Sequence, residues 1–234
     1  MATVILVRHG RTTANATGIL AGRSEGVRLD EVGVEQAAVA ARRLAAVPLA
    51  AVVSSPLERC RQTAAAILAE QSASPAPAFE LDDGITECGY GDWTGRLLRE
   101  LAEEPLWKVV QSQPSAVVFP GGESMAAMQA RAVAAVRRRD AEIEAEHGPQ
   151  AVWVAVSHGD VIKSLLADAL GLHLDLFQRI GVGPASLSIV RYSSARPEVV
   201  ATNTEAGDLS WLRAAPAPDP AGAPVGGGAG HAPA

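Results

Sequence analysis

Short apolar runs alternate along the chain with stretches whose apolar residues recur at helical spacing. Thr3–Val7 is a β-branched apolar run, Ala50–Val53 is a second, weaker one, and Ala151–Val156 is the strongest. Such runs are typical of strands that are buried on both faces of a parallel sheet. Residues 187–192 and 198–202 predict two further, weaker strands. Strands that alternate with helices predict an α/β layered fold.

Helical spacing follows the second and third of these runs, and it also covers residues 33–46 and 124–146. After the second run, Ser54-Ser55-Pro56 is typical of a helix start. After the third run and its helix, Gly171 stands where a C-terminal cap belongs. We expect residues 93–124, which are interrupted by prolines and glycines, to be part helix and part loop and to lie over the pocket.

Composition divides the chain near residue 213. The 234 residues, 48% of them hydrophobic, suit one large domain or two small ones. Residues 214–234 are almost entirely Ala, Pro and Gly, and such a segment cannot bury enough apolar surface to offset its ordering entropy. We therefore expect one domain over residues 1–213 and a disordered tail over residues 214–234.

Net charge and cysteine content limit which partners and which cellular compartment we expect. A formal net charge of −6 argues against a general nucleic-acid binder, which would usually carry a basic stripe. No apolar stretch approaches the roughly 18 residues that a membrane span needs. Cys60 and Cys88 have neither metal-type spacing nor a disulfide framework, which favours a reducing compartment. We expect a cytoplasmic protein that binds neither nucleic acid nor membrane; its oligomeric state stays open, a homodimer included.

Two histidines stand in matching positions, in Arg8-His9-Gly10 and in Ser157-His158-Gly159, each directly after an apolar run. The ends of parallel strands meet at one edge of a sheet, where ligands bind. Arg59, early in the helix after the second run, adds a third cation to the same edge. Two cations about 4 Å apart repel by ~4 kcal/mol at an effective dielectric near 20. The cluster makes sense if an anion occupies it, and arginine forks and helix N-termini suit a phosphate dianion.

Other sites fit these residues less well. His9, His158 and a carboxylate have the chemistry of a zinc site, but the adjacent arginines would repel a dication and no HExxH-type spacing is present. The chain has no GxxxxGK[ST] motif. Gly181-Val182-Gly183 precedes a proline and a strand, unlike a dinucleotide fingerprint. We therefore expect no metal.

Five motifs, in order, resemble those of the histidine phosphatase superfamily, the phosphoglycerate mutase-like proteins. The chain is most similar to a bacterial group that carries the label phosphomutase by similarity alone, and the match runs from residue 2 to about 205. This resemblance implies a three-layer α/β/α sandwich with a central, mostly parallel sheet. The motifs are Arg8-His9-Gly10-Arg11-Thr12-Thr13-Ala14-Asn15, Ser54-Ser55-Pro56-Leu57-Glu58-Arg59-Cys60-Arg61-Gln62-Thr63-Ala64, Glu87-Cys88-Gly89-Tyr90-Gly91-Asp92-Trp93-Thr94-Gly95, Pro120-Gly121-Gly122-Glu123-Ser124 and Ser157-His158-Gly159.

The resemblance also implies a metal-independent reaction that needs no cofactor. His9 is then the nucleophile that becomes phosphorylated, and Glu87 is the proton donor. Asp160, which we expect in the first turn of a helix, is a minor rival to Glu87 as the acid. The residues implied to bind the phosphoryl group are Arg8, Asn15, Arg59, His158 and Gly159. The residues considered as further substrate contacts are Arg11, Glu123 and Ser124.

Three functions follow from this pattern. The first is hydrolysis of a small phosphorylated metabolite, the second is a mutase that returns the phosphoryl group to another hydroxyl, and the third is a non-catalytic phosphate-binding regulator. The stretch Tyr90–Gly95 and the short insertion after it resemble the phosphatases rather than the mutases. The presence of both His9 and Glu87 argues against the third function. Cys60 and Cys88 stand beside Arg59 and Glu87 in the sequence. We expect both side chains to pack as ordinary buried residues, and the sequence leaves open whether they lie close together.

Overall fold

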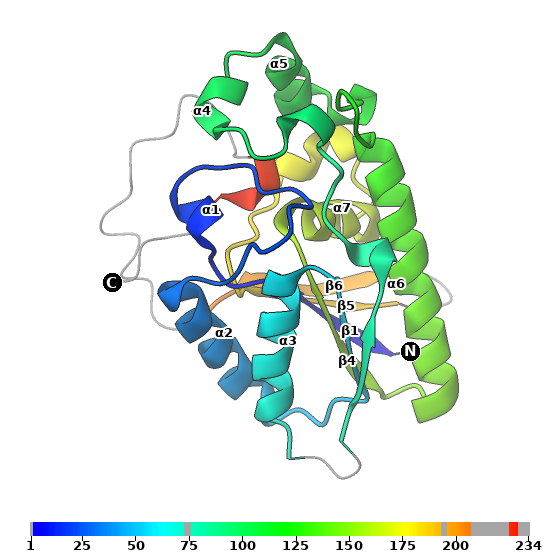
Figure 1. Ribbon diagram of the computed structural model, residues 1–234. Helices are drawn as coiled ribbons and strands as arrows, with labels where there is room; N and C mark the ends of the chain where they lie inside the picture. Colours follow the sequence, from blue (N-terminus) through cyan, green and yellow to red (C-terminus); the bar gives the residue numbers. More distant parts are fainter. Residues whose placement is uncertain (1, 73–75, 193–195, 207–224, 229–234) are drawn as a thin grey trace.

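A six-stranded mixed sheet forms the centre of the protein (Figure 1). The computed structural model describes residues 2–72, 76–192, 196–206 and 225–228. The strand order is β3-β2-β4-β1-β5-β6; the first four strands run parallel to one another, β5 pairs antiparallel with β1, and β6 pairs antiparallel with β5. The strands are β1 (Thr3–Arg8), β2 (Ala51–Ser54), β3 (Ala78–Leu81), β4 (Val152–Ser157), β5 (Leu187–Arg191) and β6 (Glu198–Thr204).

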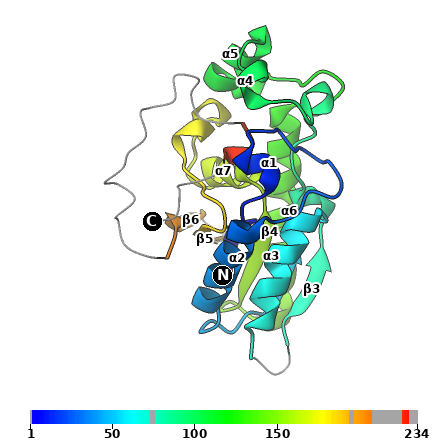
Figure 2. The ribbon, with the colours of Figure 1, turned by 60° about the vertical axis from the view of Figure 1, so that its left-hand side comes forward.

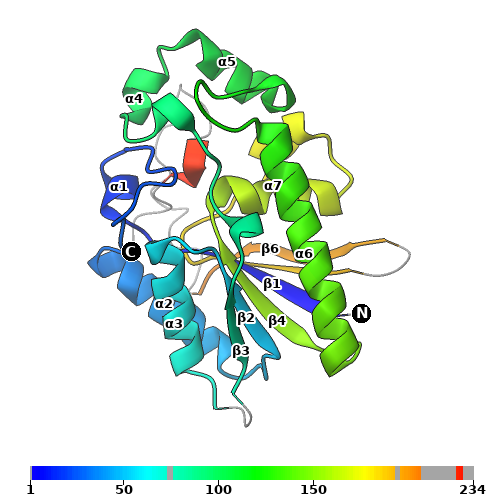
Figure 3. The ribbon, with the colours of Figure 1, turned by 45° about the vertical axis from the view of Figure 1, so that its right-hand side comes forward.

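Helices cover both faces of the sheet, with α2 and α3 on one side and α6 and α7 on the other (Figure 3). The helices are α1 (Thr13–Ala16), α2 (Glu31–Leu44), α3 (Glu58–Ala69), α4 (Leu98–Leu101), α5 (Pro105–Ser112), α6 (Met125–His147) and α7 (Gly159–Ala169). The short 3-10 turns are η1 (Asp83–Ile85), η2 (Gly91–Trp93), η3 (Pro114–Ala116), η4 (Leu174–Arg179) and η6 (Val225–Gly227). Within the described ranges, no helix is both long and apolar enough to cross a membrane.

The alternation of side chains along the central strands builds two cores. Val4 and Leu6 of β1 belong to the larger core, which includes residues of α6 and α7. Ile5 and Val7 belong to the smaller core, with residues of α2 and α3. Successive side chains of a strand point to opposite faces, so a strand between two helical layers must be apolar at every position. The predicted three-layer α/β/α sandwich with a mostly parallel sheet is therefore confirmed.

The main departure from the predicted elements is β3, which the hydropathy pattern does not indicate. Its side chains are exposed, and Phe79 and Leu81 are 45% and 46% accessible. An edge strand of this kind is held by its backbone pairing to β2 rather than by a buried face, so it has no apolar signature. The region 93–124 is part helix and part loop, as expected, and its helices α4 and α5 lie above α7 (Figure 1).

Residues 225–228 of the predicted tail pack against the domain. The turn η6 lies between α1 and α7 in each view (Figures 1 and 2), and Val225 is 2% exposed and belongs to the larger core. Val225 gives residues 225–228 an apolar contact with the domain that the Gly/Pro-rich composition does not indicate. The expected disorder of the tail stays a prediction. The rest of residues 214–234 lies outside the described residues, and the domain boundary near residue 213 stays a prediction.

Strand register brings the expected junctions to one edge of the sheet. Arg8 at the end of β1 pairs with Ser157 at the end of β4, and Ser54 at the end of β2 pairs with Val156. The residues that follow these strands therefore emerge side by side. His9 and His158 confirm this directly, since their ring centroids lie 5.2 Å apart.

The loop after β1 is fixed by a close backbone contact with α2. A Cβ added to Gly33, in the first turn of α2, would lie 1.9 Å from the carbonyl oxygen of Arg11, and one added to Gly10 would lie 2.3 Å from that of Gly33. The side chain of Asp30 caps α2 by accepting from the Gly33 N–H, and it also accepts from Arg11 Nε at 2.8 Å. Two glycines thus let the loop that carries His9 lie directly on the helix.

Gly33→Ala tests this contact. Although alanine favours a helix over glycine by about 1 kcal/mol, the new methyl group meets backbone atoms that cannot rotate away. We expect the free energy of unfolding in urea to fall by roughly 1–3 kcal/mol. Gly181→Ala is the matched control, since a Cβ there would meet only Asn203 Nδ2 at 3.5 Å. Equal stability of Gly33→Ala and the wild type would contradict the close approach.

Candidate active site

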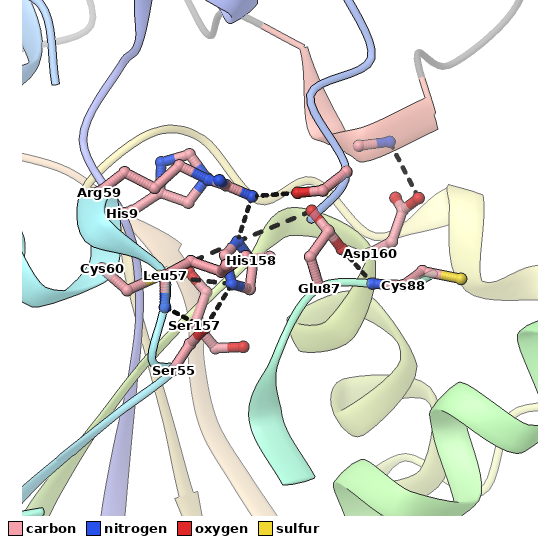
Figure 4. Close-up of polar contacts among 12 residues, drawn as sticks. His9, Ser55, Leu57, Arg59, Cys60, Glu87, Cys88, Ser157, His158 and Asp160 are labelled. Carbon is pink, nitrogen blue, oxygen red and sulfur yellow. Dashed lines mark hydrogen bonds and ion pairs between the residues drawn. The ribbon is translucent and has the colours of Figure 1, made fainter. Parts of the chain in front are cut away.

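A pocket opens at the edge of the sheet where β1, β2 and β4 end. Its polar lining comes from the loop after β1, the start of α3 and the loop before η2, and its apolar lining comes from the loop after α1, α4 and η6. The lining residues are His9, Thr12, Asn15, Ile19, Leu20, Ala21, Gly22, Arg59, Glu87, Leu98, Val225, Gly226 and Gly228. Figure 4 shows His9, Arg59, His158 and Glu87 converging at this edge.

The ring of His9 is held in one tautomer. Its Nδ1 lies 2.7 Å from the carbonyl oxygen of Gly10. A carbonyl oxygen can only accept, so Nδ1 carries the ring proton and Nε2 carries the lone pair. The Nε of Arg59 donates to this Nε2 at 3.2 Å, which agrees with an acceptor there. His9 therefore lines the pocket as a neutral imidazole whose unprotonated nitrogen is Nε2.

His9 stays neutral at ordinary pH. Burial, followed by the positive charges of Arg59 and Arg8, holds the pKa of His9 well below its usual value. Like charge and desolvation both disfavour the imidazolium. The same arginines that provide an anion site therefore keep the lone pair of His9 free of a proton.

Arg59 is the central cation of the site. It is 2% exposed, and its Nη2 donates to the carbonyl oxygen of Gly22 at 2.8 Å and to His158 Nδ1 at 3.2 Å. Its Nη1 is buried without a hydrogen-bond partner in the described part of the chain. A buried guanidinium N–H that lacks an acceptor is costly, and a phosphoryl oxygen in the pocket would satisfy it.

His158 lies behind Arg59 rather than in the pocket lining. Because Arg59 donates to its Nδ1, the proton of the neutral ring sits on Nε2, which is 2.8 Å from Ser55 Oγ. Its pKa is held well below the usual value by burial, then by Arg59. Ser55 and His158 together fix the orientation of the guanidinium, a contact that the motif pattern does not reveal.

Arg8 is fully buried, and peptide carbonyls surround its guanidinium. Its Nη1 donates to Val182 O at 2.9 Å, and its Nη2 donates to the carbonyl oxygens of Gly226 and Gly228 in the C-terminal segment. Burial lowers the pKa of Arg8 to about 10, so it is still charged at neutral pH. The contact with residues 225–228 is absent from the sequence prediction, because glycine-rich composition gives no signal for a backbone carbonyl as a ligand.

Glu87 is 3% exposed and faces the histidines. Its Oε2 lies 3.7 Å from His158 Nδ1, and its Oε1 accepts the backbone N–H of Cys88 at 2.9 Å. Burial, followed by the negative charge of Asp160, raises the pKa of Glu87 to about 7. A carboxyl group in this range can give and take a proton near neutral pH, as a general acid–base must.

The remaining predicted site residues divide into two groups. Asn15 lines the pocket, where its Oδ1 accepts from the N–H and the Oγ1 of Thr12 in a capping box. Gly159 begins α7 and is not among the described lining residues. Arg11, Glu123 and Ser124 are not among the described lining residues. Arg11 pairs with Asp30, Glu123 pairs with Arg23 and Arg131, and Ser124 caps α6. Direct substrate contact by these three stays a prediction without geometric support.

The two cysteines are free and buried. Cys60 Sγ lies 3.5 Å from His158 Nε2, and burial raises its pKa to about 12. Burial also raises the pKa of Cys88, so neither sulfur is a thiolate at neutral pH. Ordinary packing describes both. In the described residues, no three His, Cys, Asp or Glu side chains gather as a metal site would require.

Known proteins are similar to this chain in sequence and in fold. Phosphoserine phosphatase 1 of Hydrogenobacter thermophilus is 31% identical over 206 residues, covering 87% of this chain and 92% of that protein. The protein named probable phosphoglycerate mutase in Yersinia pestis is 32% identical over 197 residues, covering 83% and 87%. The mycobacterial glucosyl-3-phosphoglycerate phosphatase structure has a TM-score of 0.74 at 25% identity and covers 87% of this chain and 99% of that one. A family model matches residues 4–205, and the chain therefore belongs to the histidine phosphatase superfamily, branch 1.

Proposed function

We propose that this protein is a metal-independent phosphatase that hydrolyses a small phosphomonoester through a phosphohistidine on His9. One observation carries the proposal: the Gly10 carbonyl keeps the proton of His9 on Nδ1, so the lone pair of Nε2 belongs to a pocket that Arg59 and Glu87 also line. A nucleophile, a cation for the phosphoryl group and a protonatable carboxyl thus share one small site. That combination supports phosphoryl transfer better than passive anion binding.

In the first step, His9 Nε2 attacks phosphorus while the bond from phosphorus to the leaving-group oxygen breaks. The leaving oxygen takes the proton of the Glu87 carboxyl, so an alcohol departs and Glu87 becomes a carboxylate. The hydrogen bond from His9 Nδ1 to Gly10 persists and stabilises the cationic phosphoimidazole. In the second step, Glu87 takes a proton from water, whose oxygen attacks phosphorus. The nitrogen–phosphorus bond then breaks, and its electron pair returns to Nε2.

In this proposal the phosphoryl oxygens bind to groups in the pocket lining and at the start of α7. Arg59 Nη1 offers a donor that has no acceptor among the described residues. Asn15 uses its carboxamide oxygen within the loop, and its amide nitrogen is the end that would reach a phosphoryl oxygen. The backbone N–H groups at the start of α7, at Gly159, add the favourable potential of a helix N-terminus. In this proposal His158 acts by orienting Arg59.

Hydrolysis rather than mutase activity is favoured by the Tyr90–Gly95 stretch and by the short insertion that follows it. That insertion contributes the brief helices α4 and α5, and Leu98 of α4 lines the pocket. The relatives named for phosphatases include the 31% identical phosphoserine phosphatase 1. The proposed substrate is a small phosphorylated metabolite whose leaving group meets the apolar wall of Ile19, Leu20 and Leu98.

Turnover of a panel of phosphomonoesters tests the proposal. The panel contains p-nitrophenyl phosphate, sugar phosphates and phosphoglycerates, with a metal chelator present. We expect release of free phosphate, a radiolabelled phosphoenzyme that is stable to alkali, and loss of both in His9→Ala. His173→Ala is the control, because the His173 side chain is 68% exposed. Isomerised product with little free phosphate would support the mutase instead, and loss of activity on chelation would overturn the metal-independent mechanism.

The pH dependence of hydrolysis should report the ionisation of Glu87. The acid is competent while it is protonated, so kcat/KM for an alkyl phosphate should fall as the pH rises above about 7. Glu87→Gln should lower kcat/KM by roughly 10²–10⁴-fold and remove this alkaline limb. Glu123→Gln is the control, since that carboxylate is paired with arginines outside the pocket. An alkaline limb that survives in Glu87→Gln would assign the acid to another group.

Detachment of residues 225–228 should strengthen anion binding. The carbonyl oxygens of Gly226 and Gly228 compete with a phosphoryl oxygen for Arg8 Nη2. Val225→Asp places a charge at a position that is 2% exposed, which should release the segment. We expect the inhibition constant of orthovanadate to fall about threefold to tenfold, the equivalent of one hydrogen bond. Val200→Asp, at a residue that is 44% exposed, should leave it unchanged; equal or weaker inhibition in Val225→Asp contradicts the competition.

A further inference from the structure

A second carboxylate, Asp160, is buried next to Glu87 and is unused by the proposed reaction. It lies in the first turn of α7 and is fully inaccessible. Its Oδ2 accepts two hydrogen bonds, from Tyr90 Oη at 2.8 Å and from the Gly226 N–H at 2.9 Å. Its Oδ1 lies 4.0 Å from Lys163 Nζ. Asp160 is therefore not a solvated residue at a helix start. Its burial is compensated by specific hydrogen-bond donors.

Tyr90 joins the two carboxyl groups. Its hydroxyl lies 2.8 Å from Asp160 Oδ2 and 3.5 Å from Glu87 Oε1, and the whole side chain is buried. The shorter distance indicates that the hydroxyl proton points to Asp160. The ring is fixed by edge-to-face contact with Phe119, with centroids 5.0 Å apart. Tyr90 therefore holds Asp160 at a set position relative to Glu87.

Charged and titratable groups face Glu87 from several elements. Arg59 on α3, Arg8 at the end of β1 and Lys163 on α7 favour its ionised form, whereas Asp160 disfavours it. The neutral ring of His158 lies 3.7 Å away, and the cations Arg23 and Arg131 donate to the Glu87 backbone carbonyl. Without Asp160, the surrounding charges would be almost entirely positive. Burial would still raise the pKa of Glu87, but no negative charge would oppose the cations, which favour its carboxylate form.

We propose that Asp160 is a positioning residue for Glu87: its negative charge, fixed by Tyr90 and by the start of α7, keeps the Glu87 carboxyl protonated and ready to donate. When two nearby carboxyl groups compete for one proton, the group with weaker hydrogen-bond support keeps it. Asp160 Oδ2 accepts two hydrogen bonds, the residue lies at a helix N-terminus, and its Oδ1 is 4.0 Å from Lys163 Nζ. Glu87 has one firm donor, the Cys88 N–H. This inference rests on the proposed role of Glu87.

In this arrangement the general acid and the negative charge are two different residues, Glu87 and Asp160. Asp160 does not line the pocket in the described residues, whereas Glu87 does. Asp160 therefore holds the negative charge beside the cations, and Glu87 faces the substrate with its proton. Asp160 is thus a partner of the general acid instead of its rival.

Asp160→Asn tests the inference through the leaving group. Amide and carboxylate have similar shapes, so the charge is removed with little change in volume. We expect the alkaline limb of kcat/KM for an alkyl phosphate to move down by about one pH unit. At pH 7.5, turnover of the alkyl phosphate should fall about tenfold, while that of p-nitrophenyl phosphate, whose leaving group needs little protonation, should fall less than about threefold. Equal losses for both esters would indicate mere structural damage and overturn the inference.

A titration that does not depend on turnover separates this inference from the proposed function. In protein labelled with carbon-13 at the Glu side-chain carboxyl, the resonance that disappears in Glu87→Gln belongs to Glu87. Its midpoint, near pH 7 in the wild type, should fall by about one unit in Asp160→Asn. If no ester is turned over but the midpoint moves, the phosphatase proposal fails and the coupling stands. An unchanged midpoint overturns the coupling whatever the activity.

Two further variants complete the test. Tyr90→Phe keeps the ring and removes the hydrogen bond that holds Asp160 beside Glu87, so the Glu87 midpoint should fall by a smaller amount. This variant carries the test if Asp160→Asn does not fold. Asp140→Asn is the matched control, since Asp140 is 3% exposed and its partner is Trp153 Nε1 at 2.9 Å. A shift as large in Asp140→Asn as in Asp160→Asn would also overturn the inference.

Discussion

Positive charge buried at one edge of the sheet is the constraint on which the rest of the site depends. Arg8 and Arg59 are 0% and 2% exposed, and both lie beside His9. Burial of a charge is costly unless partners compensate it. The chain provides that compensation with peptide carbonyls from Gly22, Val182 and the C-terminal segment, and with the nearby carboxyl group of Asp160.

The same constraint affects the ionisation of both histidines. Burial, followed by the charges of the arginines, lowers the pKa of each ring, so two neutral rings lie next to two cations. The backbone then decides what each ring does: the Gly10 carbonyl fixes the tautomer of His9, whereas Arg59 fixes that of His158. Two residues with similar sequence surroundings thus present different atoms. His9 offers a lone pair to the pocket, and His158 supports the guanidinium behind it.

The C-terminal segment and α7 connect this edge to the rest of the fold. Gly226 bonds to Arg8 through its carbonyl oxygen and to Asp160 through its N–H, so four residues of a glycine-rich tail contact both a cation and an anion of the site. Its backbone has a φ of +74°, which favours glycine at this position. The pocket is thereby closed on one side by main chain, with Val225 as the apolar anchor.

The hydropathy pattern and the motifs are sufficient to predict the layered fold and the group of residues at its edge. Apolar runs mark β1, β2 and β4 because strands between two helical layers must be apolar throughout, and motif order identifies His9, Arg59 and Glu87. Hydropathy could not indicate β3, because backbone pairing to β2 holds that strand in the sheet. It also could not indicate the docking of residues 225–228, because their carbonyl oxygens make the contact with Arg8. Two further features depend on tertiary contacts. The Gly10 carbonyl leaves Nε2 as the nitrogen of His9 that lacks the ring proton, and Asp160 lies against Tyr90 instead of facing solvent. Those outcomes depend on distances between residues far apart in the chain, and no local pattern of residue types encodes such distances.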